Sequence, residues 1–228
     1  MKTKKSLLDY SQALRLLENI GEEDVGASAT IKLFRANKRF MLEILEAVCA
    51  ELSSRRERML DLGCGYGGLS KLISEVLYFK EVYGVDLDEQ RLKLAKERGL
   101  HVFKCDLEKD RLPFPQDHFD LVTMFGVLEH LKFYDNSIAE ARRVLKSNGL
   151  LLISIPNLGS WANRTALFLG YQPRDLEVSS CIIVGVHKMY NNVYRRILPV
   201  GHISGVTYRA LKELLEFYGF MVTKCWGD

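Results

Sequence analysis

The glycine-rich segment of this 228-residue chain reads Met59-Leu-Asp-Leu-Gly-Cys-Gly-Tyr-Gly-Gly-Leu-Ser70. Its apolar start predicts a strand, and Gly63, Gly65 and Gly67 allow the backbone to turn tightly after it. A helix that follows such a turn presents free N–H groups to a ligand. Gly63, Gly65 and Gly68 also satisfy the Gly-x-Gly-x-x-Gly fingerprint of dinucleotide-binding proteins, so this segment alone does not identify the ligand.

Short apolar runs alternate with helical patterns on both sides of this segment. The predicted strands span residues 59–62, 82–85, 102–105, 119–125, 150–155 and 220–226. The predicted helices span residues 31–52, 89–98, 135–146 and 208–218, with a shorter helical pattern before residue 20. Strands that alternate with helices in this way favour an α/β fold with a parallel sheet covered on both faces.

Three carboxylates fall where predicted strands end. Asp61 lies two residues before the first glycine, where it suits a cationic group such as an amine or a sulfonium. Asp86 ends the next strand and can accept hydrogen bonds from both hydroxyls of a ribose. Asp106 follows the third strand, where it can accept from the exocyclic amine of an adenine. A nicotinamide cofactor requires the glycines and the ribose acid but not Asp61.

Six segments follow one another in an order and spacing that identify a family. They are Leu-Asp-Leu-Gly-Cys-Gly-Tyr-Gly (60–67), Val-Tyr-Gly-Val-Asp (82–86), Phe-Lys-Cys-Asp (103–106), Leu-Pro-Phe-Pro-Gln-Asp-His-Phe-Asp-Leu-Val (112–122), Val-Leu-Glu-His-Leu (127–131) and Glu-Ala-Arg-Arg-Val-Leu-Lys-Ser-Asn-Gly-Leu-Leu-Leu-Ile-Ser-Ile-Pro-Asn (140–157). With them, residues 59–157 resemble the class I S-adenosylmethionine-dependent methyltransferases, in the small-molecule, quinone-biosynthesis-like branch. The resemblance implies a Rossmann-like, doubly wound α/β fold with a mostly parallel sheet of six or seven strands.

The resemblance also implies the cofactor, S-adenosyl-L-methionine, with S-adenosyl-L-homocysteine as product. Carried over position by position, the cofactor-binding residues are Asp61, Gly63, Cys64, Gly65 and Gly67 for the methionine moiety, Asp86 and Leu87 at the ribose, Asp106 and Leu107 at the adenine, and Phe125 and Val127 closing over the methionine end.

The domain organisation follows from the length, which suits one domain. Within a single methyltransferase domain of residues 1–228 we expect a helical cap (1–54), a cofactor-binding core (55–155), an insertion or lid after strand five (156–206) and a final helix and strand (207–228). The insertion and the cap are expected to cover the cofactor crevice. Aromatic residues of the insertion, such as Trp161 and Tyr171, either line an apolar acceptor pocket or pack in the core.

Catalysis of methyl transfer depends mainly on alignment of donor and acceptor, so a general base is optional. The candidates for that base are His130 and His202, with Glu129 behind them. For His130 a structural role is an equal alternative, and for His202 structural hydrogen bonding is the favoured one. The expected acceptor is a small molecule, whose identity and reacting atom the sequence does not specify.

Rival functions have weaker support in the sequence. An NAD(P)-dependent Rossmann oxidoreductase would not need Asp61 or Asp106. An RNA or protein methyltransferase is a second alternative, but residues 124–130 lack the Asn/Asp-Pro-Pro-aromatic pattern of base methylation, and a net charge of +3 does not suit phosphate tracking. We find no paired-acid site for aminopropyl transfer. A non-catalytic cofactor-binding domain stays open.

A metal is not expected. The five cysteines are far apart and form no Cys-x-x-Cys pair, and the loop after strand four lacks the acidic cluster of metal-assisted catechol methylation. Free cysteines suit a reducing cytosol, so the expected localisation is cytoplasmic. No apolar stretch approaches the ~20 residues of a membrane span.

The end of the chain carries a further expectation. Residues 220–226 account for strand six, and only Gly227 and Asp228 remain for a seventh strand. Because an unpaired strand edge attracts other chains, we expect a six-stranded sheet, a contact that covers the edge (such as that of a homodimer), or a chain shorter than the natural protein. A seventh strand would have to come from an overlooked strand at residues 181–186.

Overall fold

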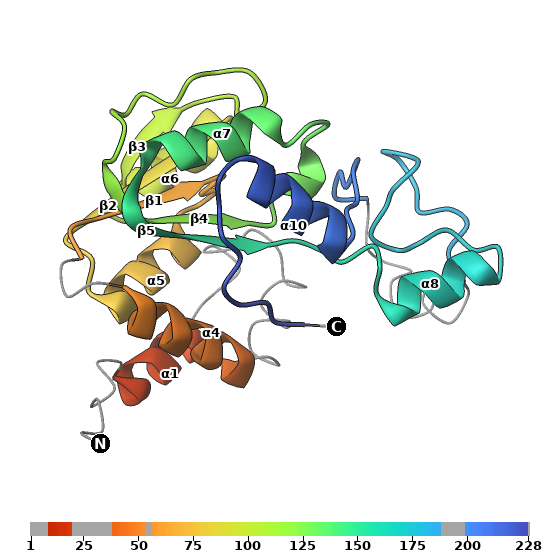
Figure 1. The fold of residues 1–228 in the computed structure, drawn as a ribbon, viewed down its shortest axis with the longest axis horizontal. Helices are drawn as coiled ribbons and strands as arrows, with labels where there is room; N and C mark the ends of the chain where they lie inside the picture. The colour runs from red at the N-terminus through yellow and green to blue at the C-terminus, as the bar shows by residue number, and fades with distance from the viewer. Residues whose placement is uncertain (1–8, 20–37, 53–55, 188–198, 228) are drawn as a thin grey trace. The chain divides into compact units, whose positions relative to one another are not determined.

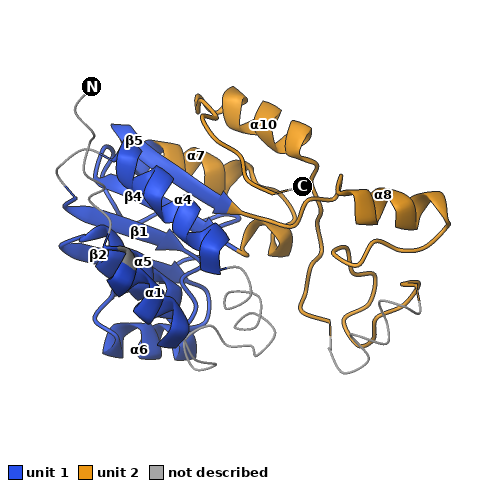
Figure 2. Ribbon diagram, turned by 90° about the horizontal axis from the view of Figure 1, so that it is seen from below, with its two compact units in different colours: residues 1–125, 143–153 blue, residues 126–142, 154–228 orange. Residues whose placement is uncertain are grey.

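A computed structural model describes residues 9–19, 38–52, 56–187 and 199–227. The chain forms two compact units (Figure 2). Unit 1 comprises residues 1–125 and 143–153, and unit 2 comprises residues 126–142 and 154–228. Each unit is described by itself below.

Unit 1 is built on one sheet (Figure 1). Its strands are β1 (Arg58–Leu62), β2 (Glu81–Asp86), β3 (His101–Lys104), β4 (Phe119–Phe125) and β5 (Leu145–Ser154). The strand order is β3-β2-β1-β4-β5, and the pairs β1–β2, β1–β4 and β2–β3 are parallel. The chain therefore reverses its direction of travel across the sheet between β3 and β4. The topological switch point, at which α/β folds bind ligands, therefore lies between the neighbouring strands β1 and β4.

The predicted six or seven strands are wrong for the described part of the chain, where the sheet has five. Residues 220–226 form no strand, and neither do residues 181–186. The apolar, β-branched and aromatic residues of segment 220–226 express only a local preference, and a strand also needs a neighbour to receive its backbone hydrogen bonds. Gly185 has φ +74°, a conformation that breaks an extended strand.

The helices of unit 1 cover this sheet much as the sequence predicts (Figure 1). They are α1 (Tyr10–Asn19), α4 (Lys38–Glu51), α5 (Gly68–Leu77) and α6 (Glu89–Glu97). Helices α1, α4 and α5 pack together through buried apolar residues such as Leu17, Leu45 and Ile73. The predicted helix 31–52 is confirmed from Lys38 onward, and residues 31–37 lie outside the described residues.

Helix α7 (Asp135–Val144) ends two residues before its predicted end, and β5 begins at once with Leu145. The Lys146 ammonium contacts the Asp120 carboxylate of β4 at 2.6 Å, which draws the backbone into the sheet early. Gly149 consequently lies within β5 and does not end the helix. A Cβ on Gly149 would lie 2.8 Å from Cγ of Leu145.

Unit 2 contains the helices of the second half, η1 (Leu128–His130), α8 (Trp161–Phe168) and α10 (Tyr208–Phe217) (Figure 2). Thr207 caps α10, because its hydroxyl accepts from the N–H of Ala210. Helix α8 lies within the predicted insertion. The two ends of that insertion meet in a parallel bridge between Asn157 and Val206. The insertion is therefore a loop closed at its base.

Among the described residues, no helix combines the length and the apolar character needed to cross a membrane.

Candidate functional site

The glycine loop between β1 and α5 is fixed by backbone hydrogen bonds to β2. The N–H groups of Gly63 and Cys64 both donate to the carbonyl oxygen of Val85, at 2.8 and 2.9 Å. Gly65 and Gly67 have φ of +52° and +79°, which glycine adopts without strain. No side chain caps the N-terminus of α5, and a Cβ on Gly65 would meet no atom within 4 Å. The loop thus leaves both open space and helix N–H groups for a ligand.

The Cys64 side chain turns away from this space and packs against β2. A Cβ on Gly84 would lie 2.6 Å from its sulfur, so Gly84 is required for the loop to approach the sheet. The thiol is buried, and this burial raises its pKa, helped by the charges of Asp61 and Asp86. Cys64 therefore offers a ligand its backbone, while its side chain holds the loop in place.

Asp61 is a buried carboxylate with neutral partners. In the sheet it lies between Gly84 of β2 and Thr123 of β4. One carboxylate oxygen accepts from the Ser70 hydroxyl at 2.5 Å and the other from the Thr123 hydroxyl at 2.6 Å. Burial raises the pKa of Asp61 to about 6 although both hydroxyls lower it. A buried carboxylate without a cation among these partners is suited to receive an ammonium group.

Asp86 closes β2 beside the glycine loop. Its carboxylate accepts from the N–H of Gly65 and from the N–H of Asp88, each at 2.9 Å. Each oxygen retains a second acceptor site, which a ribose hydroxyl can use. Asp88 caps α6 as predicted by accepting from two N–H groups of that helix, and Leu87 is 60% exposed at the rim.

The Asp106 carboxylate already has partners within the chain, in addition to the adenine predicted for it. Its carboxylate contacts the ammonium of Lys109 at 2.8 Å and accepts from the N–H of Glu108 at 3.0 Å. Lys109, followed by that N–H group, lowers the pKa of Asp106. An adenine amine would therefore share this carboxylate with Lys109. Leu107 beside it is buried.

Phe125 and Val127 flank the end of β4. Phe125 is half-buried at the last position of the strand and belongs to unit 1. Val127 is buried in unit 2. Unit 1 therefore holds every predicted cofactor residue except Val127.

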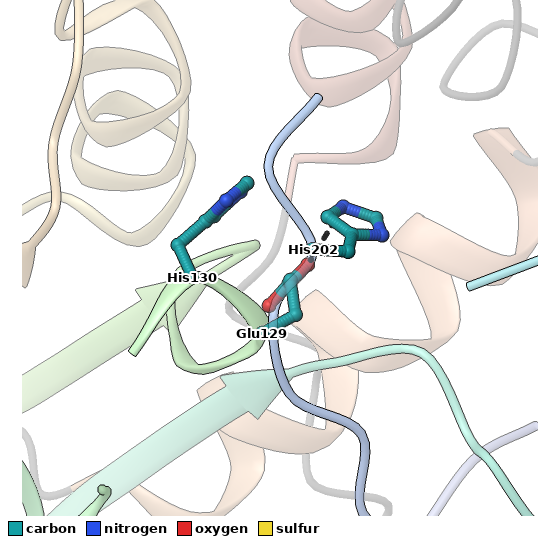
Figure 3. Close-up of side chains that lie close together, drawn as sticks. All are labelled: Glu129, His130 and His202. Atoms are coloured by element: carbon teal, nitrogen blue, oxygen red, sulfur yellow. Dashed lines mark ion pairs between the residues drawn. The ribbon is translucent and has the colours of Figure 1, made fainter. Parts of the chain in front are cut away.

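A second group of polar residues lies within unit 2, formed by Glu129, His130 and His202 (Figure 3). One ligand-type atom of each residue lies within 4.8 Å of the other two. Glu129 Oε1 is 3.9 Å from His202 Nε2, and the two imidazole rings are 5.1 Å apart. Burial raises the pKa of Glu129 and lowers that of His202. The structure thus brings together the two histidines that the sequence offered separately.

Backbone contacts join the two segments that carry these side chains. The carbonyl oxygen of Glu129 accepts from the N–H groups of Ile203 and Ser204 at 2.9 and 3.2 Å. The Glu177 carboxylate accepts from the N–H groups of Val200, Gly201 and His202, the shortest at 2.7 Å. Residues 200–204 are therefore held against η1.

Sequence reasoning missed three of these supporting residues. Thr123 is the one hydroxyl side chain in the buried strand β4, which marks it as a partner for a buried group. Ser70 stands in the first turn of α5, where its hydroxyl points back toward β1. Glu177 has no local signal, because the N–H groups it binds are more than twenty residues away.

The aromatic residues of the insertion do not form a core. Trp161 is 77% exposed, and Tyr171 is 37% exposed. Tyr190 and Tyr194 of the same insertion lie outside the described residues.

Comparison with known proteins places these features in a family. A family model described as "Methyltransferase domain" matches residues 32–224. The chain is 33% identical over 140 residues to the mitochondrial ubiquinone biosynthesis O-methyltransferase of Candida albicans, covering 58% of this chain and 40% of the relative. It is 36% identical over 103 residues to a ubiquinone/menaquinone biosynthesis C-methyltransferase of Paraburkholderia xenovorans, covering 42% of each. The chain thus spans about two fifths of the length of these relatives.

Solved structures share the fold. An S-adenosylmethionine-dependent methyltransferase of Thermotoga maritima superimposes with a TM-score of 0.54 at 20% identity, covering 92% of this chain and 82% of that one. One from Archaeoglobus fulgidus gives the same TM-score and identity, with 93% and 75% coverage. The glycine loop at a topological switch point, the acids at the ends of β1 and β2, and the family match over residues 32–224 lead to one conclusion: this chain belongs to the class I S-adenosylmethionine-dependent methyltransferase family.

Proposed function

We propose that this chain transfers a methyl group from S-adenosyl-L-methionine to a small-molecule acceptor. The observation that carries the proposal is Asp61, a buried carboxylate whose partners are the neutral hydroxyls of Ser70 and Thr123. The amino group of the cofactor's methionine moiety would supply the missing positive charge. A nicotinamide cofactor would place a pyrophosphate near the same loop, and a carboxylate would repel it.

The remaining cofactor contacts follow from the ends of the strands. Asp86 would bind the ribose hydroxyls, with Leu87 beside the ribose. Asp106 and Leu107 would bind the adenine, and Phe125 and Val127 would cover the methionine end. The loop Gly63–Gly67 would bind through its backbone, because the Cys64 side chain is used in packing.

The acceptor side is proposed to lie with His130 and His202, and residues 156–206 are proposed as its lid. When bound, the cofactor supplies a methyl group already activated on a positively charged sulfur, so alignment matters more than a general base. The related proteins are named for O- and C-methylation in ubiquinone or menaquinone biosynthesis. Their names support a small-molecule acceptor.

Calorimetric titration tests the cofactor. S-adenosylhomocysteine should bind at one site per chain, and NADH should produce no saturable heat. Tight binding of NADH without a response to S-adenosylhomocysteine would contradict the proposal. The matched control is the Asp61→Asn variant, which keeps the shape of the side chain but removes the charge and should weaken S-adenosylhomocysteine by about 10- to 100-fold.

A further inference from the structure

The group Glu129, His130 and His202 offers a chemistry beyond the acceptor contact proposed for its two histidines. Glu129 is 4% exposed, and its Oε2 atom is buried without a hydrogen-bond partner. Its Oε1 atom faces Nε2 of His202 at 3.9 Å, too far for a hydrogen bond (Figure 3). A buried carboxylate oxygen without a partner is costly, and such a group in a native protein points to an unseen water or ion.

The tautomer of His130 adds a second ligand. Its Nδ1 atom lies 2.9 Å from the carbonyl oxygen of Gly201, and a carbonyl can only accept, so Nδ1 carries the proton. In the neutral ring Nε2 then keeps a free lone pair. A histidine held by a backbone carbonyl on one nitrogen is the usual form of a metal-binding histidine.

The backbone around the group is already arranged. The bonds from Ile203 and Ser204 to the carbonyl of Glu129 hold the His202 segment beside η1. The Ser204 hydroxyl donates to the carbonyl of Leu128 at 3.1 Å and lies 2.8 Å from the Tyr134 hydroxyl. The ligand-type atoms lie up to 4.8 Å apart, whereas ligands of a tetrahedral ion at ~2.1 Å are about 3.4 Å apart. Binding therefore requires side-chain rotations that bring the three ligand atoms closer together, while backbone contacts already hold the two segments side by side.

We infer that Glu129, His130 and His202 form a binding site for a divalent transition-metal ion of the zinc class. Two imidazoles and one carboxylate suit zinc and its neighbours, whereas magnesium prefers oxygen ligands. Three protein ligands leave a fourth position open, which an oxygen atom can occupy. This role replaces a general-base role for both histidines, because a nitrogen bound to a metal cannot accept a proton. It also contradicts the metal-free expectation from the sequence.

The experiment uses the full chain with Cys181→Ser and Cys225→Ser, because both cysteines are exposed and thiolates also bind zinc. Zinc is titrated into this protein after chelator treatment, in competition with a chromophoric chelator and without cofactor. One equivalent should bind. His130→Gln, His202→Gln and Glu129→Gln should each weaken it by about 100-fold or more. His187→Gln, the same change in unit 2 outside the group, should leave the affinity unchanged.

Histidine spectra of the chain with Glu129, His130 and His202 unchanged test the site even if one of the variants does not fold. In ¹⁵N-histidine spectra, zinc should shift the ring nitrogens of two of the five histidines, those of His130 and His202. The inference is overturned if zinc does not saturate at one equivalent, if other histidines shift, or if magnesium saturates the site and zinc does not. S-adenosylhomocysteine binding is measured separately, so failure of this site leaves the proposed methyl transfer standing.

Discussion

At the scale of a single residue, the raised pKa of Asp61 predicts how the free energy of unfolding depends on pH. Burial raises its pKa from an ordinary value of 3.8 to about 6. Between these values the folded chain holds a proton that the unfolded chain has released, so the free energy of unfolding falls as the pH rises through this window. The contribution is up to about 3 kcal/mol, at ~1.4 kcal/mol per pH unit.

Urea unfolding at pH 4 and pH 7 measures this effect. Asp88 and Asp106 have lowered pKa values and act in the opposite direction, so the useful quantity is the difference between the native chain and Asp61→Asn. The native chain should lose more stability than the variant between the two pH values. Equal losses in both proteins would show that Asp61 titrates normally.

The same carboxylate should make cofactor binding pH-dependent. Below about pH 6 a proton must leave Asp61 before an ammonium group can bind. The affinity for S-adenosylhomocysteine should therefore fall by up to about tenfold per pH unit below 6 and be flat above it. Calorimetry in two buffers of different ionisation enthalpy should detect the released proton at pH 5 and none at pH 7.5.

Asp86 and Asp88 form a natural pair for comparison. Asp86→Ala should weaken S-adenosylhomocysteine binding by roughly 1.5–3 kcal/mol, the range of hydrogen bonds to a charged group. Asp88→Ala removes the cap of α6 and should lower the thermal stability while leaving the affinity unchanged. Calorimetry and thermal unfolding measure the two effects. A change below twofold in Asp86→Ala, with the fold intact, would remove Asp86 from the ribose site.

At the scale of elements, Gly67 and Gly99 allow the energetic cost of backbone strain to be compared with that of close packing. Gly67 and Gly99 both have positive φ, +79° and +93°. A Cβ on Gly67 would lie 2.9 Å from that of Ala95 in α6, whereas a Cβ on Gly99 would meet no atom within 4 Å. Gly99→Ala should therefore cost about 1–2 kcal/mol from strain alone, and Gly67→Ala should cost more. Chemical denaturation checks the order, and equal losses would mean that α6 moves aside freely.

The success of sequence reasoning also differed between elements. The strand, loop and helix around Gly63–Gly67 could be predicted because glycine positions and apolar runs encode them locally. The end of α7 could not, because no glycine or proline separates Val144 from Leu145 and a contact from Lys146 to Asp120 starts the strand. Residues 220–226 are apolar enough to suggest a strand, but the neighbour that a strand needs is a property of the fold.

The two candidate sites also differ in how far the sequence alone could predict them. Asp61 and Asp86 could be placed because the ends of parallel strands share one edge of a sheet. The closeness of His130 and His202 could not, since the residues are far apart in sequence and meet through the carbonyl of Glu129. The predicted roles of the individual site residues remain to be tested by the variants above.

At the scale of the molecule, the two sites should fail independently. Asp61 and Asp86 belong to unit 1, and Glu129, His130 and His202 belong to unit 2, each set with its own hydrogen bonds. Asp86→Ala should weaken S-adenosylhomocysteine and leave zinc affinity within about twofold, and His202→Gln should do the reverse. Both affinities are measured on both variants and on their combination. A loss of both ligands in either single variant would mean that the two sites are coupled.

The packing of Cys64 against Gly84 has a consequence for thiol reactivity. Its buried sulfur has a raised pKa and stays protonated at neutral pH, and a thiol in that form reacts slowly with alkylating agents and peroxide. Oxidants should therefore modify Cys181 and Cys225 first, since both are exposed. When those two are replaced by serine, the rate of Cys64 alkylation measures how often the glycine loop opens. A bound ligand should lower that rate.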